Sequence, residues 1–156
     1  MSGDVRRLEA WDAARLRGLA DAFDTPLYVV DPDRVRENCE RLRRAFPDAD
    51  VHFAVKANTT RTVLETVREA GLGAECASAG EVRRALDAGF PADRVRYTAV
   101  NPPGRDLDHV VEWATERPGL TVTVDSRDTL DRIVDRGYDG RLCVRVNPGV
   151  GAGHHE

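Results

Sequence analysis

The stretch Val51-His52-Phe53-Ala54-Val55-Lys56 carries the pattern on which the fold of this chain depends. It is a short, largely apolar run of the kind that forms a buried strand, and residues 61–70 after it have helical spacing. The same succession of strand-like run, polar or glycine-containing turn and helical segment recurs along the chain. Strands separated by helices need crossover connections, which favour a parallel sheet with helices outside it. The sequence therefore predicts an α/β protein.

The recurrence is nearly regular from Val51 onward, which favours a (β/α)8 TIM barrel over an open, doubly wound sheet. A closed barrel has eight strands and about 250 residues, whereas only five barrel units are visible in this chain of 156 residues. We therefore expect a partial barrel, the amino-terminal part of a longer protein. The predicted strands are residues 27–30, 51–56, 73–77, 95–100, 121–124 and 142–146, and the predicted helices are residues 32–45, 61–70, 80–88, 106–116 and 127–135.

The first thirty residues differ from the rest of the chain. One helical face gathers apolar side chains before Asp24-Thr25-Pro26 interrupts the helix: Leu8, Trp11, Leu16, Leu19 and Phe23. We therefore interpret residues 1–30 as a lead-in helix and strand, and residues 31–156 as the incomplete barrel.

Composition narrows the functional classes. The 23 basic and 27 acidic residues give a net charge of -4, which disfavours a mainly electrostatic grip on nucleic acid or anionic lipid. No apolar run approaches the roughly 20 residues of a membrane-spanning helix, and the amino terminus has no apolar core of a secretory signal. The sequence predicts a cytoplasmic protein without nucleic-acid or membrane partners.

The cysteines and the terminal histidines give no metal site. Cys39, Cys76 and Cys143 lie far apart and form no CxxC pair, so we interpret them as small buried apolar residues. The adjacent residues His154-His155-Glu156 lack the one-face spacing of helical metal motifs. No metal is predicted.

Polar side chains stand where the predicted strands end, which in a parallel barrel is the functional end. They are Lys56, then Glu75 and Ser78, then Asn101, then Asp125, and finally Arg145 with Asn147. Alternate side chains on a strand face opposite sides. This alternation places Lys56, Asp125 and Arg145 on the inward face.

Lys56 is the single lysine among the 23 basic residues, and it ends an apolar run. A neutral lysine amine can attack a carbonyl to form a Schiff base, either with a substrate aldehyde or ketone or with pyridoxal phosphate. The pattern alone leaves a second reading open, in which Lys56 pairs with Glu75 or Asp125 at the barrel rim.

Four motifs, in order, resemble one family. Phe53-Ala54-Val55-Lys56-Ala57-Asn58 resembles the cofactor-lysine motif of the pyridoxal-phosphate enzymes with an alanine-racemase-like barrel. The segment at residues 25–31 and the run Ala77-Ser78-Ala79-Gly80-Glu81, with residues 88–90, resemble the decarboxylase branch. Arg145-Val146-Asn147-Pro148, with residues 149–155, is most similar to the diaminopimelate decarboxylases. The resemblance covers residues 25–156.

This resemblance implies a barrel of the alanine-racemase-like type and pyridoxal 5'-phosphate as cofactor. Lys56 would be catalytic and would hold the cofactor covalently, with Glu75, Ser78, Arg145 and His155 as further cofactor-binding residues. Glu75 stands where the family often has an aspartate, which leaves its role open. Arg145 would lie near the cofactor's phenolic side, and a salt bridge to Glu75 or Glu81 is the alternative.

The implied reaction removes the carboxylate at the D-configured centre of meso-diaminopimelate, giving L-lysine and carbon dioxide in a homodimeric enzyme. Two alternatives stay open: another amino-acid or polyamine-precursor decarboxylase of the same fold, and a non-catalytic pyridoxal-phosphate carrier. The resemblance places the phosphate cradle, the acidic partner of the pyridine nitrogen, the cross-dimer residues and a carboxyl-terminal β-domain outside these residues. The chain alone is therefore expected to be inactive.

Overall fold

The structure is a computed structural model that describes residues 11–149, and the chain divides into two compact units between Asp31 and Pro32. The first unit contains helix α1 (Ala13–Phe23). Asp12 begins this helix, because its carboxylate accepts the backbone N–H of Ala14 at 2.9 Å. No residue of α1 is buried.

The strand predicted at residues 27–30 is wrong. These residues pair with no strand in the described part of the chain, and Tyr28 is fully exposed. A β-strand exists only through hydrogen bonds to a neighbouring strand, so local β propensity was not sufficient here.

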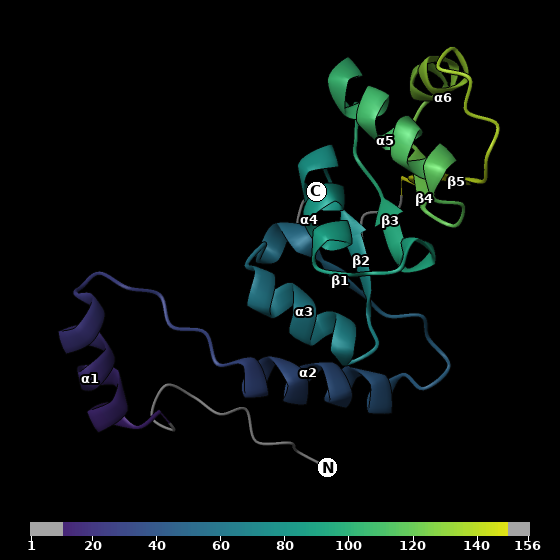
Figure 1. Cartoon of the computed structure of the whole chain (residues 1–156). Helices are drawn as coiled ribbons and strands as arrows, with labels where there is room; N and C mark the ends of the chain where they lie inside the picture. The colour runs from purple at the N-terminus through teal and green to yellow at the C-terminus, as the bar shows by residue number, and fades with distance from the viewer. Residues whose placement is uncertain (1–10, 150–156) are drawn as a thin grey trace. The chain divides into compact units, whose positions relative to one another are not determined.

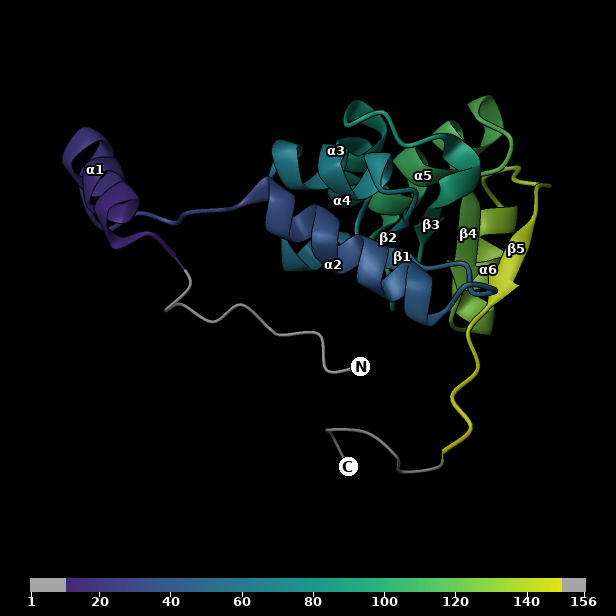
Figure 2. The ribbon, with the colours of Figure 1, turned by 90° about the horizontal axis from the view of Figure 1, so that it is seen from below.

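The second unit is a five-stranded sheet whose strands follow one another in chain order, all parallel (Figure 2). Helices connect the strands, with α2 alongside α3 and α6 alongside α5 (Figure 1). This arrangement confirms the predicted α/β class. The strands are β1 (His52–Ala54), β2 (Gly73–Cys76), β3 (Val95–Tyr97), β4 (Thr121–Val124) and β5 (Leu142–Val144); the helices are α2 (Pro32–Ala45), α3 (Arg61–Glu69), α4 (Ala79–Asp87), α5 (Gly104–Glu116) and α6 (Arg127–Val134), with short 3-10 turns η2 (Val55–Ala57) and η3 (Ala92–Arg94).

The helix ends follow the sequence chemistry. Pro32 opens α2, where the missing N–H costs nothing, and Ser78 and Ser126 begin α4 and α6. Gly71 and Gly89 follow α3 and α4 with φ of 82° and 84°, a region that favours glycine. Within residues 11–149, no helix combines the length and the apolar character needed to span a bilayer.

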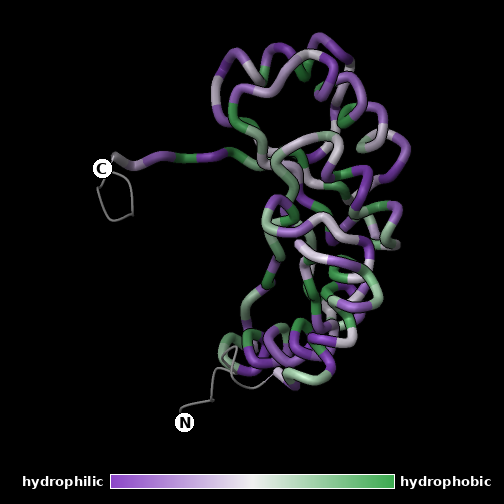
Figure 3. Tube along the Cα trace, turned by 90° about the vertical axis from the view of Figure 1, so that its left-hand side faces the viewer, coloured by the Kyte–Doolittle hydropathy of each residue, from purple (hydrophilic) through white to green (hydrophobic). Residues whose placement is uncertain are grey.

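One face of the sheet forms the core. Side chains that alternate along β2, β3 and β4 are fully buried, as period two requires, and hydrophobic stretches recur between hydrophilic ones along the trace (Figure 3). The buried residues include Ala74, Cys76, Val95, Tyr97 and Val122 on the strands, with Leu64, Val82, Leu107 and Ile133 on the helices. Helices α3 to α6 therefore cover the face that the sequence marks as apolar.

The cysteine prediction holds for two of three residues. Cys39 and Cys76 are buried, and burial raises the pKa of both thiols, which disfavours the reactive thiolate. The prediction is wrong for Cys143, which is exposed. It lies on β5, whose outer edge has no partner strand among the described residues, and the next residue, Val144, is 68% exposed.

The amino ends of β1 and β3 carry a network of charged residues on the other face. The Asp50 carboxylate accepts hydrogen bonds from His52 Nε2 at 2.9 Å, from Arg96 at 2.8 Å and from Arg94. The bond from His52, with help from Arg94, lowers the pKa of Asp50. His52 is thus a packed, hydrogen-bonded residue at the end of the strands away from Lys56.

Replacing Gly73 with alanine is expected to destabilise the protein by about 1–3 kcal/mol. A Cβ at this position would lie 2.3 Å from Cε1 and Nδ1 of His52, and the ring is held by Asp50. Urea unfolding measures the effect, and the double variant G73A/H52A should lose less than the sum of the single variants. The matched control is Gly18→Ala in α1, where a Cβ meets nothing within 4 Å. An unchanged free energy of unfolding for G73A would contradict this packing.

Candidate active site

Lys56 lies just beyond the first strand, at the carboxyl end of the sheet. The sequence placed it on the strand, but β1 ends at Ala54 and Lys56 lies in the turn η2. The turn forms because Val55 is fully buried beneath it and the N–H of Asn58 closes it on the Val55 carbonyl at 3.1 Å. The core thus fixes the backbone on one side of Lys56.

The Lys56 side chain is exposed and has no bonding partner within residues 11–149. It forms no ion pair or hydrogen bond in this part of the chain, so the alternative reading, a rim pairing with Glu75 or Asp125, is absent from the structure. A primary amine that is not committed to a carboxylate can react with an aldehyde.

Glu75 lies on β2, in register with Ala54 of β1 and Arg96 of β3. Its half-buried carboxylate accepts a hydrogen bond from the Thr98 hydroxyl. Thr98 follows β3 and donates its backbone N–H to the Cys76 carbonyl at 2.8 Å, which extends the ladder by one step. Sequence reasoning missed Thr98, although period two from Arg96 places it on the same face as Glu75.

Ser78 shapes the start of α4. Its hydroxyl accepts the N–H of Glu81 at 3.2 Å, and the Glu81 carboxylate accepts the N–H of Ala77 at 2.9 Å. This arrangement is similar to a capping box, except that Glu81 accepts the N–H of Ala77, the residue before the N-cap Ser78. Asp106 of α5 adds a third acceptor, for the N–H of Ala79 at 2.9 Å. The structure therefore gives Ser78 a structural task, and its predicted contact with a cofactor stays a prediction.

Arg145 comes directly after β5, and its N–H bonds to the Val124 carbonyl at 2.8 Å. Its side chain is exposed and forms no ion pair within the described part of the chain, so the alternative salt bridge to Glu75 or Glu81 is absent. The structure leaves this guanidinium available for an anionic group. His155 lies outside the described residues.

These groups fit pyridoxal phosphate. Lys56 offers an amine for the aldehyde and Arg145 offers a cation for an anionic oxygen, and neither side chain has a partner within residues 11–149. Glu75 offers a carboxylate whose orientation is set by Thr98. Because β1, β2 and β5 are parallel members of one sheet, all three groups belong to its carboxyl end.

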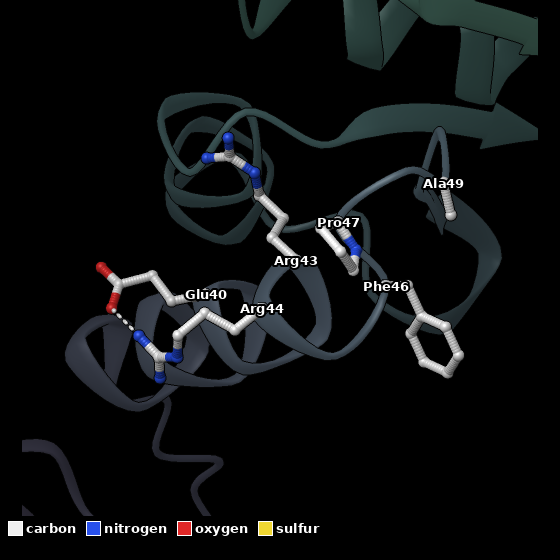
Figure 4. Close-up of a pocket in the computed structure, with 6 residues that line it drawn as sticks. All are labelled: Glu40, Arg43, Arg44, Phe46, Pro47 and Ala49. Atoms are coloured by element: carbon white, nitrogen blue, oxygen red, sulfur yellow. Dashed lines mark hydrogen bonds and ion pairs between the residues drawn. The ribbon is translucent and has the colours of Figure 1, made fainter.

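A surface hollow elsewhere in the chain does not contain the candidate site residues. It lies before β1, at the carboxyl end of α2, and is lined by Glu40, Arg43, Arg44, Phe46, Pro47 and Ala49 (Figure 4). Both of its guanidiniums have partners: Arg43 donates to the Ala70 carbonyl at 2.9 Å, and Arg44 pairs with Glu40 at 3.5 Å. These contacts are structural.

Comparison with known proteins identifies the class. The family described as "Pyridoxal-dependent decarboxylase, pyridoxal binding domain" matches residues 32–156. The chain therefore belongs to the pyridoxal-dependent decarboxylases, and the matched residues belong to their pyridoxal-binding domain. This result confirms the predicted family and the predicted cofactor, pyridoxal 5'-phosphate.

Individual relatives show which members of the family the chain is similar to. The chain is 43% identical over 143 residues to the diaminopimelate decarboxylase of Methanothermobacter thermautotrophicus, covering 88% of this chain and 32% of the relative. The structure of the Helicobacter pylori diaminopimelate decarboxylase with L-lysine has a TM-score of 0.76 at 26% identity, over 86% of this chain and 35% of that one. The Selenomonas ruminantium lysine decarboxylase has a TM-score of 0.77 at 26% identity, over 92% and 38%.

These likenesses confirm the predicted partial barrel of the pyridoxal-phosphate-binding type. The chain spans about a third of the length of the curated relatives that it matches.

Replacing Ser78 with alanine is expected to cost about 1 kcal/mol of stability, because the Glu81 N–H loses its side-chain acceptor and keeps only the Ser78 carbonyl. Ser78→Asp, which keeps a side-chain acceptor, should retain most of that stability. Urea unfolding of the cofactor-free protein measures both. Equal stability of S78A and the parent protein would contradict the capping assignment.

Proposed function

We propose that this chain is the cofactor-binding part of a diaminopimelate decarboxylase, which converts meso-diaminopimelate into L-lysine and carbon dioxide. The observation that carries the proposal is the free amine of Lys56 at the carboxyl end of the sheet, inside the matched pyridoxal-binding domain. The substrate is inferred from the curated relatives at 32–43% identity that bear this name.

Different residues of this chain have different proposed roles. Lys56 Nζ provides the covalent attachment point, and Glu75, Ser78, Arg145 and His155 are the proposed further cofactor-binding residues. When bound, pyridoxal phosphate supplies an electron sink for the pair of electrons left by the departing carbon dioxide. The protein must hold the bond to be broken in the right orientation.

Three features support individual roles. The backbone at Lys56 is anchored by the buried Val55, so the amine leaves from a fixed point. The Thr98 hydroxyl limits the directions in which the Glu75 carboxylate can turn. The exposed amine of Lys56 can also hold a proton at Nζ and deliver it to the carbon that loses the carboxylate.

The arrangement of the intact protein follows from the same proposal. We propose that residues 1–30 lead into the barrel, that residues 31–156 form its first five units, and that the intact protein adds the remaining barrel and a carboxyl-terminal β-domain. The chain's coverage of about a third of its relatives supports this division. The family resemblance supports a homodimer, and the composition supports a cytoplasmic enzyme without nucleic-acid or membrane partners.

The test uses the intact protein that contains this chain, loaded with pyridoxal phosphate. We expect it to release carbon dioxide from meso-diaminopimelate and to form L-lysine. Lys56→Ala and Lys56→Arg should each lower turnover at least about a thousandfold, since neither side chain is a nucleophilic amine. Arg84→Ala is the matched control, because Arg84 is an exposed cation of α4 and should leave turnover unchanged.

Two results would overturn the proposal. Release of carbon dioxide from L-lysine in preference to diaminopimelate would identify a lysine decarboxylase, a competing function that the structural likeness to the Selenomonas enzyme supports. Tight cofactor binding without turnover of either amino acid would identify a carrier.

A further inference from the structure

The segment between β3 and α5, residues 98–103, is held by side chains from outside itself; we refer to it as the β3–α5 loop. Asn101 lies in this loop with φ of 46°, in the left-handed region that non-glycine residues seldom adopt. Its backbone N–H donates to Asp125 Oδ2 at 3.0 Å. A residue held in this conformation needs support from its surroundings, and Asp125 supplies it.

The Asp125 carboxylate is itself fixed. Thr129 donates its hydroxyl to Asp125 Oδ1 at 2.8 Å, and Thr129 is only 1% exposed. The hydrogen bond from Thr129, followed by the backbone N–H of Asn101, lowers the pKa of Asp125, so the group is anionic at neutral pH. Both carboxylate oxygens thus have defined donors.

Helix α6 and the turn after it contact the backbone that follows Asn101. Arg132 donates to the Pro102 carbonyl at 2.7 Å, and Arg136 donates to the Gly104 carbonyl at 3.4 Å. Arg136 also pairs with Asp108 of α5 at 2.7 Å. The backbone from Asn101 to Gly104 therefore receives three contacts: from Asp125 after β4, from Arg132 of α6 and from Arg136 just beyond α6.

The other end of the loop reaches the candidate active site. Thr98 donates its hydroxyl to Glu75 and its backbone N–H to Cys76. Only two residues separate Thr98 from Asn101. The loop therefore connects the carboxylate of Glu75, beside the proposed cofactor site, to the carboxylate of Asp125.

We propose that Asp125 is a positioning residue of this site: it holds the Asn101 amide, thereby fixes the β3–α5 loop, and through Thr98 sets the orientation of Glu75. Asp125 is assigned a positioning role because its two oxygens accept from Asn101 and Thr129. The effect on turnover rests on the proposed decarboxylase function, whereas the effect on the loop does not.

The first test measures hydrogen exchange at the Asn101 amide in the intact, cofactor-free protein. Asp125→Ala removes the acceptor, and exchange should accelerate roughly tenfold to a hundredfold, as expected for a lost hydrogen bond to a charged group. Asp131→Ala is the matched control: it removes an exposed aspartate of α6 whose side chain forms no bond within residues 11–149. Exchange at Asn101 should stay within about twofold in D131A.

Asp125→Asn guards against a variant that merely fails to fold. Its amide oxygen can still accept from Asn101, and its NH2 group can donate to the Thr129 hydroxyl. Asn101 should keep most of its protection in D125N. Equal protection of the Asn101 amide in D125A and the parent protein would overturn the proposal.

The second test measures turnover of diaminopimelate and the dissociation constant of pyridoxal phosphate. D125A should lower kcat about tenfold or more, because a small displacement of a reacting group is costly, and D125N should recover most of it. The variants D125A and T98V should be non-additive, since both act on Glu75 through one segment.

Additive effects of D125A and T98V on kcat would contradict transmission through the loop. If the parent protein does not decarboxylate any amino acid, the proposed function fails. The amide-exchange result would still decide whether Asp125 fixes the loop.

Discussion

Parallel pairing of β1 to β5 in chain order is the constraint on which the rest of the structure depends. It brings the carboxyl ends of all five strands to one edge, and its period of two separates an apolar face from a polar one. Helices α3 to α6 bury the apolar face. The polar groups near the carboxyl ends of the strands therefore lie at the same edge of the sheet. They include Lys56, Glu75 and Arg145.

The two ends of the strands differ in how their charges are used. At the amino end, the Asp50 carboxylate accepts hydrogen bonds from His52, Arg94 and Arg96, so these charges stabilise the fold. At the carboxyl end, Lys56 and Arg145 have no ionic partner among residues 11–149. Unpaired cations cost little when exposed, and they remain available to bind. This contrast agrees with the division of parallel barrels into a stability face and a functional face.

Sequence reasoning succeeded where one local pattern decides the structure. Helix α2 and strand β4 occupy the predicted residues, because each combines a clear period with a capping or turn residue. It failed where a distant partner decides. Within residues 11–149, residues 27–30 pair with no strand and Cys143 lies on a strand whose outer edge is unpaired; Lys56 lies in a turn that begins at the buried Val55. The Thr98–Glu75 and Asn101–Asp125 hydrogen bonds were not predicted, because each joins residues more than 20 positions apart in the sequence.

The central claim is that the Lys56 amine carries the cofactor, and the sequence makes it unusually easy to test. Lys56 is the only lysine in these 156 residues, so any labelled lysine within them must be Lys56. Borohydride reduction of the cofactor-loaded intact protein, followed by peptide mass spectrometry, should find a reduced pyridoxyl group on the peptide that contains Lys56. Recovery of that peptide without the added group would contradict the account.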